Sequence, residues 1–84
     1  MLEPVQCRMA RAALKWSAED LAHASGVSAS TIRRFERNGG GLHFHNLRLI
    51  FRALEDAGVI LLGPGDIIDG GPGVRLRKAT ADAG

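Results

Sequence analysis

Residues 17–36 read SAEDLAHASGVSASTIRRFE, a pattern typical of two short helices joined by a tight turn. Ser17 is a preferred N-cap residue, and the two acidic residues that follow it favour the positive end of a helix dipole. Gly26 suits the end of the first helix because glycine adopts a left-handed backbone without strain. Ser28 can cap a second helix, which we expect to end near residues 38–41, Asn-Gly-Gly-Gly. The stretch therefore predicts a helix, a turn and a second helix in close succession.

The apolar and polar side chains of this stretch fall on different sides of the two predicted helices. Ala22 is small enough for two helix backbones to cross closely beside it. The inward-facing apolar residues are Leu21, Val27, Ile32 and Phe35. The opposite side of the second helix then carries Ser30, Arg33, Arg34 and Arg37. A short helix with exposed arginines, held by a tight turn on a supporting helix, is suited to the major groove of DNA.

Further helices are expected on both sides of this motif. Pro4 suits the first turn of one, which continues with apolar residues at helical spacing, namely Cys7, Ala10 and Leu14. Another is expected from about Phe44 to Ala57, ended by Gly58, and its apolar stripe consists of Leu47, Ile50, Phe51 and Leu54. The predicted fold class is therefore mainly α, with four helices.

The C-terminal part has a different pattern. Val59–Leu62 is a short β-like run, and turns rich in glycine and proline separate it from a second run, Val74–Arg77. We interpret the two runs as a short β-hairpin, to which Ile67-Ile68 could also contribute. Residues 1–58 are then the predicted DNA-binding domain. Residues 59–78 form an extension of the same compact domain and a candidate dimerisation element, and residues 79–84 form a disordered tail.

Composition limits the class of protein. The 84 residues are enough for one small domain. No apolar run approaches a transmembrane span, and no signal peptide is evident. A single cysteine, Cys7, excludes an internal disulfide and fits a reducing cytoplasm, where we expect the protein to be. Residues 1–52 carry eight Lys/Arg and four Asp/Glu, a net charge of +4, whereas residues 53–84 carry three and five, a net charge of −2. This asymmetry favours an anionic partner for the first half, beside the alternative of a solvated basic surface.

With these residues in place, the sequence resembles the Cro/phage-repressor type of helix-turn-helix protein, often called the XRE family. The resemblance covers roughly residues 5–57, and the residues in register are Leu21-Ala22, Gly26-Val27-Ser28, Ile32 and Phe35-Glu36-Arg37. It implies a lambda-repressor-like domain and an ion pair of structural importance between Arg11 and Glu36. The sequence departs from the family in one element, because a predicted hairpin replaces the usual fifth helix.

The resemblance also implies which residues meet DNA. Those expected to face base edges are Ala29, Ser30, Thr31, Arg33 and Arg34. Those expected near phosphates are Ser17, Ala18, Ser28, Arg37, Asn38, His45 and Asn46. The family often has glutamine where this chain has Ala18 and Ala29, so fewer direct hydrogen bonds are available. Arg34 is our first choice for a bidentate contact to guanine, and Arg33 is the second.

These features predict a sequence-specific transcriptional regulator that binds double-stranded DNA as a homodimer on an inverted repeat. RNA polymerase or another protein is a further partner that its surface could contact, and no membrane is expected. The alternative is an antitoxin-like or accessory protein in which the hairpin mediates association and DNA binding is secondary. Nothing in the sequence implies an enzyme or a cofactor, since neither a catalytic triad nor a phosphate loop can be argued.

Two residue groups have competing interpretations. Cys7 lies on the predicted inner side of its helix, where a small core residue is favoured over a redox sensor. His43 and His45 could begin a metal site, but no further ligand cluster is nearby, so we expect no metal and place these histidines near phosphate.

Overall fold

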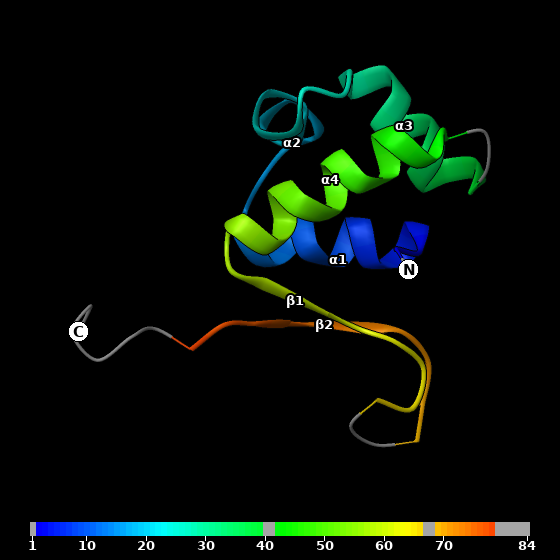
Figure 1. Cartoon of the computed structure of the whole chain (residues 1–84), viewed down its shortest axis with the longest axis vertical. Coiled ribbons are helices and arrows are strands. Elements are labelled where there is room, and N and C mark those ends of the chain that lie inside the picture. Colours follow the sequence, from blue (N-terminus) through cyan, green and yellow to red (C-terminus); the bar gives the residue numbers. More distant parts are fainter. Residues whose placement is uncertain (1, 40–41, 67–68, 79–84) are drawn as a thin grey trace.

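The computed structural model describes residues 2–39, 42–66 and 69–78. Four helices precede a two-stranded antiparallel sheet (Figure 1). The helices are α1 (Pro4–Leu14), α2 (Ala18–Ser25), α3 (Ala29–Asn38) and α4 (Phe44–Asp56), and the strands are β1 (Val59–Leu62) and β2 (Gly73–Leu76). The predicted mainly α fold with a C-terminal hairpin is confirmed, although β2 begins one residue earlier than expected. The predicted tail and Ile67-Ile68 lie outside the described residues.

The capping residues explain where α2 and α3 begin and end. The Ser17 hydroxyl accepts a hydrogen bond from the Asp20 amide (3.0 Å), and the Asp20 carboxylate accepts one from the Ser17 amide (2.9 Å). This reciprocal capping box satisfies two amides at the start of α2. Ser28 caps α3 in a similar way through the Thr31 amide. Gly26 follows α2 with a φ of 81°, in the left-handed region where a side chain would be strained.

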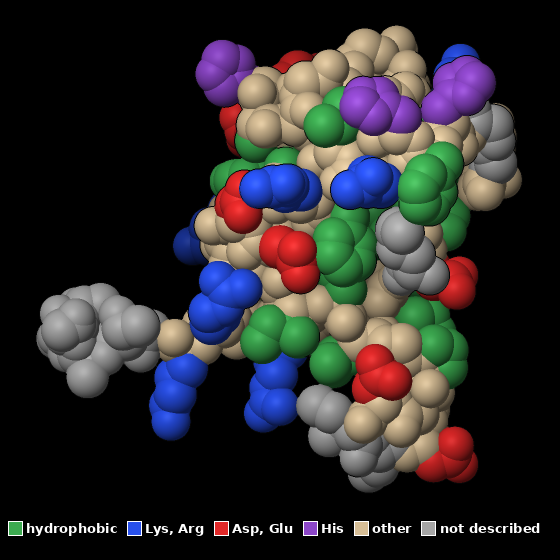
Figure 2. Space-filling view, viewed as in Figure 1, with side chains coloured by type: hydrophobic (Ala, Val, Ile, Leu, Met, Phe, Trp, Pro, Cys, Tyr) green, Lys and Arg blue, Asp and Glu red, His purple; other side chains and the backbone are tan. Residues whose placement is uncertain are grey.

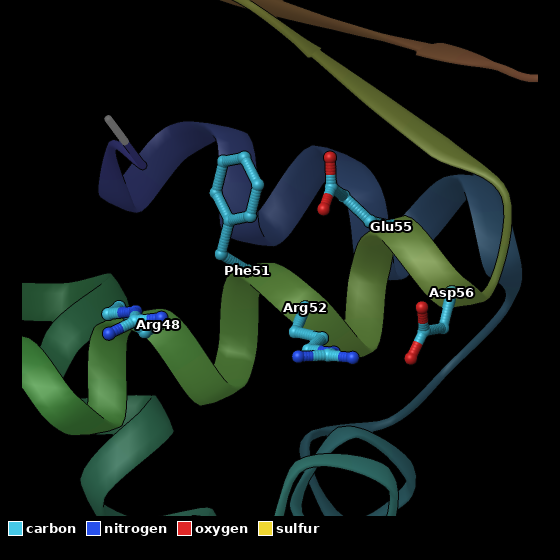
Figure 3. Close-up of a pocket in the computed structure, with 5 residues that line it drawn as sticks. All are labelled: Arg48, Phe51, Arg52, Glu55 and Asp56. Atoms are coloured by element: carbon cyan, nitrogen blue, oxygen red, sulfur yellow. The ribbon is translucent and has the colours of Figure 1, made fainter.

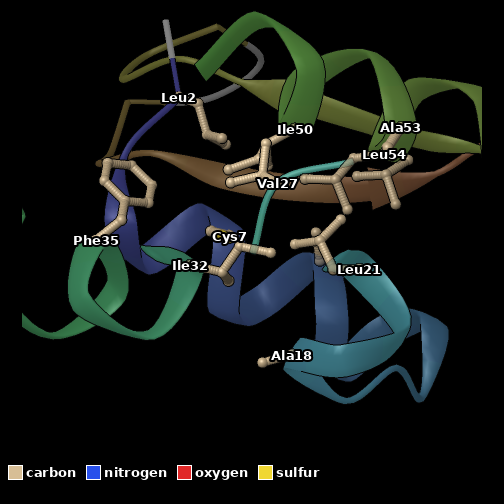
Figure 4. Packing of buried hydrophobic residues seen from close by; sticks show 12 residues of the cluster. Leu2, Cys7, Ala18, Leu21, Val27, Ile32, Phe35, Ile50, Ala53 and Leu54 are labelled. Atoms are coloured by element: carbon tan, nitrogen blue, oxygen red, sulfur yellow. The ribbon is translucent and has the colours of Figure 1, made fainter. Parts of the chain in front are cut away.

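The core lies where the helices meet (Figure 4). Leu21, Ile32, Ile50 and Leu54 are fully buried, and they come from α2, α3 and α4. Cys7 of α1 lies among them with no exposed surface, as a small core residue. Each fully buried aliphatic side chain contributes roughly 1.5–3 kcal/mol through removal from water. The helix-turn-helix is therefore held by side chains on every helix of the fold.

The hairpin packs against α1 and α4, on the side of the molecule away from α2 and α3 (Figure 1). A buried glutamine of α1, Gln6, makes a polar connection to it. The Gln6 side-chain amide donates to the carbonyl of Leu62 (2.7 Å) and to that of Gly73 (3.0 Å). Its side-chain oxygen accepts from the Glu3 amide (2.9 Å). The glutamine is 1% exposed, and all its donors have partners, so its burial carries no unsatisfied polar group.

None of the helices in the described part of the chain is both long enough and apolar enough to cross a membrane.

Candidate nucleic-acid interface

Helices α2 and α3 present the predicted motif with its apolar side inward. Ile32 and Phe35 of α3 are buried against the rest of the fold. The exposed residues of α3 are Ser30, Arg33, Arg34, Arg37 and Asn38. The arginines predicted to face outward therefore do so, on a helix that is held from behind by the core.

Three hydroxyl groups gather at the N-terminal end of α3. Besides capping the helix, the Ser28 hydroxyl donates to the Thr31 hydroxyl at 2.8 Å, and its oxygen lies 3.4 Å from that of Ser30. Thr31 and Ala29, the first residue of α3, are half-buried, whereas both serines are exposed. The start of α3 thus offers hydroxyl groups at the end of a helix dipole that favours negative charge.

Two neighbouring arginines of α3 have different surroundings. Arg33 forms an ion pair with Glu19 of α2, across the turn of the motif. The hydrogen bond from Arg33 holds the pKa of the Glu19 carboxyl below its ordinary value. Arg34 makes no side-chain hydrogen bond or ion pair within the described ranges 2–39, 42–66 and 69–78. Its guanidinium is therefore available to a ligand without loss of an existing contact.

Arg11 and Glu36 form a bidentate ion pair that joins α1 to the end of α3. The Nε and Nη2 atoms of Arg11 lie 2.8 and 2.7 Å from the two carboxylate oxygens of Glu36. Arg11 also donates to the Trp16 carbonyl (3.0 Å), and Arg8 donates to the Glu36 carbonyl. Burial by itself raises the pKa of Glu36, but hydrogen bonds from Arg11 and Cys7 outweigh it, so this pKa lies below its ordinary value. Glu36 is thus an ionised, fully partnered group that sets the position of α3 on α1.

Burial of the Cys7 thiol, next to the Glu36 carboxylate, raises the pKa of this cysteine well above its ordinary value. A thiol that is buried and protonated is a poor nucleophile. The structure therefore favours the core interpretation of Cys7 over a redox role.

The residues predicted to lie near phosphates differ in how exposed they are. The exposed ones are Ser17, Ser28, Arg37, Asn38 and His45, while Asn46 is half-buried. Ala18 is 4% exposed and its side chain belongs to the core, so only its backbone could meet a phosphate.

One face of the molecule carries acidic side chains between its basic ones, and histidines gather at the end opposite the hairpin (Figure 2). In the described part of the chain, no three His, Cys, Asp or Glu side chains lie close enough together to hold a metal ion.

The exposed side of α4 contains an open hollow of about 450 Å³. It is lined by Arg48, Phe51, Arg52, Glu55 and Asp56 (Figure 3). The two arginines are one helical turn apart, and the two carboxylates lie nearer the C-terminal end of α4. Sequence reasoning did not single out these arginines, although their spacing of four residues could have shown that they share one side of a helix. The balanced charge of the hollow distinguishes it from the surface of α3.

Comparison with known families supports the geometry of α2 and α3. A family model described as helix-turn-helix matches residues 8–55, more than half of the chain. A search of curated proteins finds no match. The matched range contains the capped helices, the turn at Gly26 and the ion pair that joins α1 to α3. The chain therefore belongs to the Cro/phage-repressor (XRE) family of helix-turn-helix DNA-binding proteins.

Proposed function

We propose that this DNA-binding regulator recognises a specific sequence by inserting α3 into the major groove and that it binds an inverted repeat as a homodimer. The observation that carries the proposal is the outer side of α3. It presents Arg34 without a competing partner in the described part of the chain, while Ile32 and Phe35 anchor the opposite side in the core. Such a helix can enter a groove without disturbing the fold behind it.

Arg34 is the residue that we assign to base recognition. A guanidinium matches the O6 and N7 acceptors of guanine, and such a bidentate contact discriminates by roughly 1–3 kcal/mol against the wrong base. Ser30 and Thr31 lie on the same helix, about one turn before Arg34. They would contact neighbouring base edges. Arg33 would have to exchange its partner Glu19 for DNA, which makes its contribution smaller.

The phosphate contacts that position α3 come from groups around the motif. Ser17 and the backbone of Ala18 lie at the start of α2, and Ser28 lies at the start of α3, where free amides favour anions. Arg37 and Asn38 at the end of α3 would approach the backbone on the other side. His45 and Asn46 in the first turn of α4 would extend this contact. Contacts of this kind fix register and affinity, while the bases supply specificity.

Selection from random duplex DNA tests the proposal. The wild-type chain should enrich an inverted repeat, and Arg34→Ala should relax the preference at one position of each half-site. Arg52→Ala is the matched control, because Arg52 is also an exposed helical arginine but lies on α4. Failure to enrich any sequence, or an unchanged motif with Arg34→Ala, would contradict base recognition by α3.

The alternative function is that of an antitoxin-like or accessory protein-binding module. It is favoured by the exposed apolar side chains of the hairpin, Ile60 and Leu76. A module whose main ligand is a protein should bind DNA weakly and without sequence preference, so the same selection experiment separates the two functions.

A further inference from the structure

The hydrogen-bonding pattern of the hairpin defines which backbone groups point outward. Val59 pairs with Leu76, Ile60 with Arg75, Leu61 with Val74 and Leu62 with Gly73. The Arg77 amide donates to the Gly58 carbonyl at 2.6 Å, so positions 58 and 77 form a hydrogen-bonded pair. Because such pairs alternate along an antiparallel ladder, Ile60–Arg75 and Leu62–Gly73 are hydrogen-bonded pairs as well. The backbone groups of Val74 and Leu76 are therefore directed away from β1, at the outer edge of β2.

The helices cover the two strands unevenly. Strand β1 packs against α4 and strand β2 packs against α1. Yet Val59 of β1 has no exposed surface, whereas Leu76, its cross-strand partner on β2, is 50% exposed. Within residues 2–39, 42–66 and 69–78, no hydrogen bond outside the β1–β2 ladder reaches the backbone of Val74 or Leu76. An accessible strand edge with unpaired amides and carbonyls is a template for another strand.

We propose that β2 pairs antiparallel with β2 of a second copy of this chain, with Val74 opposite Val74, to form a four-stranded sheet. The inference rests on the proposed function, because it supplies the homodimer that an inverted repeat requires. In this register, Leu76 lies opposite Pro72 of the second copy and beside its Val74. The half-exposed leucine is thereby covered by apolar side chains on the side of the sheet that faces the helices.

Charge disfavours two alternative registers, those centred on Arg75 and on Leu76. Pairing centred on position 75 would set two Arg75 side chains opposite each other, and pairing centred on Leu76 would set Arg75 opposite Arg77. Like charges directly opposite destabilise a strand pair. Pairing centred on Val74 instead sets Arg75 opposite Gly73, which has no side chain.

The hairpin is also complementary in charge to an antiparallel copy of itself. Asp66 and Asp69 lie near its tip, while Arg75, Arg77 and Lys78 occupy its other end. In the proposed register, Arg77 and Lys78 of one copy run alongside residues 70–71 of the other and so approach its Asp69. The two-fold axis makes this contact occur twice in the dimer, as expected for a self-complementary interface.

The resulting symmetry is compatible with DNA binding by both copies. Two antiparallel strands of identical chains are related by a two-fold axis perpendicular to their sheet. This axis leaves both helical layers on one side of the four-stranded sheet. Since α2 and α3 lie farthest from the hairpin in each copy (Figure 1), both motifs would face the same side, as two half-sites of one duplex require.

Mass measurement by light scattering, without DNA, tests this interface. Wild-type protein at micromolar concentration should have the mass of a dimer. Val74→Pro removes an amide that points outward and leaves the β1–β2 ladder intact, so it should give a monomer. Leu76→Lys should also give a monomer, because it places a charge where the second copy would cover Leu76. Ile60→Lys is the control and should remain dimeric, because Ile60 is exposed on the opposite side of the sheet.

Cysteine cross-linking tests the register. Val74→Cys should form an intermolecular disulfide under mild oxidation, because its Cα atoms would lie within disulfide range across the axis. Arg75→Cys should cross-link much less, and the wild-type chain with its buried Cys7 is the background. More efficient cross-linking of Arg75→Cys would overturn the proposed register.

A monomeric wild-type chain, or dimers that persist in both Val74→Pro and Leu76→Lys, would overturn the interface. The DNA function is measured separately on a single half-site. There, monomeric Val74→Pro should bind as well as wild type, while its affinity for the inverted repeat should fall by tenfold or more. Arg34→Ala should remain a dimer but bind the half-site less well. Its binding therefore tests the proposed function independently of the interface.

Discussion

At the scale of single residues, the most consequential contact is the ion pair between Arg11 and Glu36. Glu36 is 6% exposed, yet both its carboxylate oxygens and its carbonyl accept hydrogen bonds from arginines. A buried carboxylate without such partners would be strongly unfavourable. The pair therefore determines how α3, which carries the arginines of the proposed interface, is attached to α1.

Glu36→Gln should make the protein less stable at neutral pH, by about 1–3 kcal/mol, because charged hydrogen bonds are replaced by weaker ones. A carboxylate whose pKa is lowered in the folded state stabilises it above the unfolded pKa of about 4.3, and this contribution is lost as the pH falls through the folded pKa. The wild type should therefore lose stability below about pH 4 more steeply than the variant. Urea unfolding at a series of pH values measures both effects.

The exposed carboxylate of Glu55 on α4 provides the control for this prediction. Glu55→Gln should leave both the stability and its pH dependence close to those of the wild type, since this side chain makes no ion pair among the described residues. Equal acid sensitivity of the wild type and Glu36→Gln would show that the ion pair does not contribute to acid unfolding.

At the scale of elements, the connection between α1 and the hairpin depends on a residue that sequence patterns did not indicate. A glutamine in the first turn of a helix is ordinarily taken as a surface residue or as part of a capping box. Gln6 does form the capping box with Glu3, but it also donates to one carbonyl on each strand of the hairpin. The strands are more than fifty residues away in the chain, and no local pattern reports such a contact.

Gln6→Leu should loosen the hairpin while leaving the helix-turn-helix folded. The leucine keeps most of the volume but leaves the carbonyls of Leu62 and Gly73 without this donor, at a cost of about 1–3 kcal/mol. Hydrogen exchange should show faster exchange of the β1 and β2 amides, with little change in α3. Val5→Ala, a change at an exposed position of the same helix, should alter hydrogen exchange neither in the strands nor in α3. Unchanged exchange in the strands would show that apolar packing alone holds the hairpin.

At the scale of the whole molecule, the helix-turn-helix and the hairpin lie on opposite sides. The motif lies in the half of the chain with a net charge of +4, and the hairpin lies on the opposite side (Figure 1). DNA affinity should therefore fall linearly with the logarithm of salt concentration, as counterions are released from each contacted phosphate. Arg37→Ala should reduce this slope by about 1, the amount expected for the loss of one phosphate contact. The affinity should fall equally for all DNA sequences.

Fluorescence anisotropy at several salt concentrations measures this slope. Arg48→Ala on the hollow of α4 is the matched control and should leave the slope unchanged. A similar reduction with both variants would mean that DNA contacts extend over α4 rather than over the end of α3.

The sequence by itself was sufficient to predict the four helices, the turn at Gly26 and the outward side of α3. These features depend on capping residues and on apolar spacing of three or four positions, which act between near neighbours in the chain. It also located the hairpin, although β2 is shifted by one residue, because glycine-rich turns mark its ends only approximately.

Only the tertiary structure decided which of the predicted site residues are free. It showed that Glu19 engages Arg33 while Arg34 stays unpaired among the described residues, and that Ala18 lies in the core. It also showed that Leu76 of β2 is half-exposed while its cross-strand partner Val59 is buried. Each of these facts depends on contacts between elements, whose relative placement is set by packing of the whole core and leaves no periodic signal in the sequence.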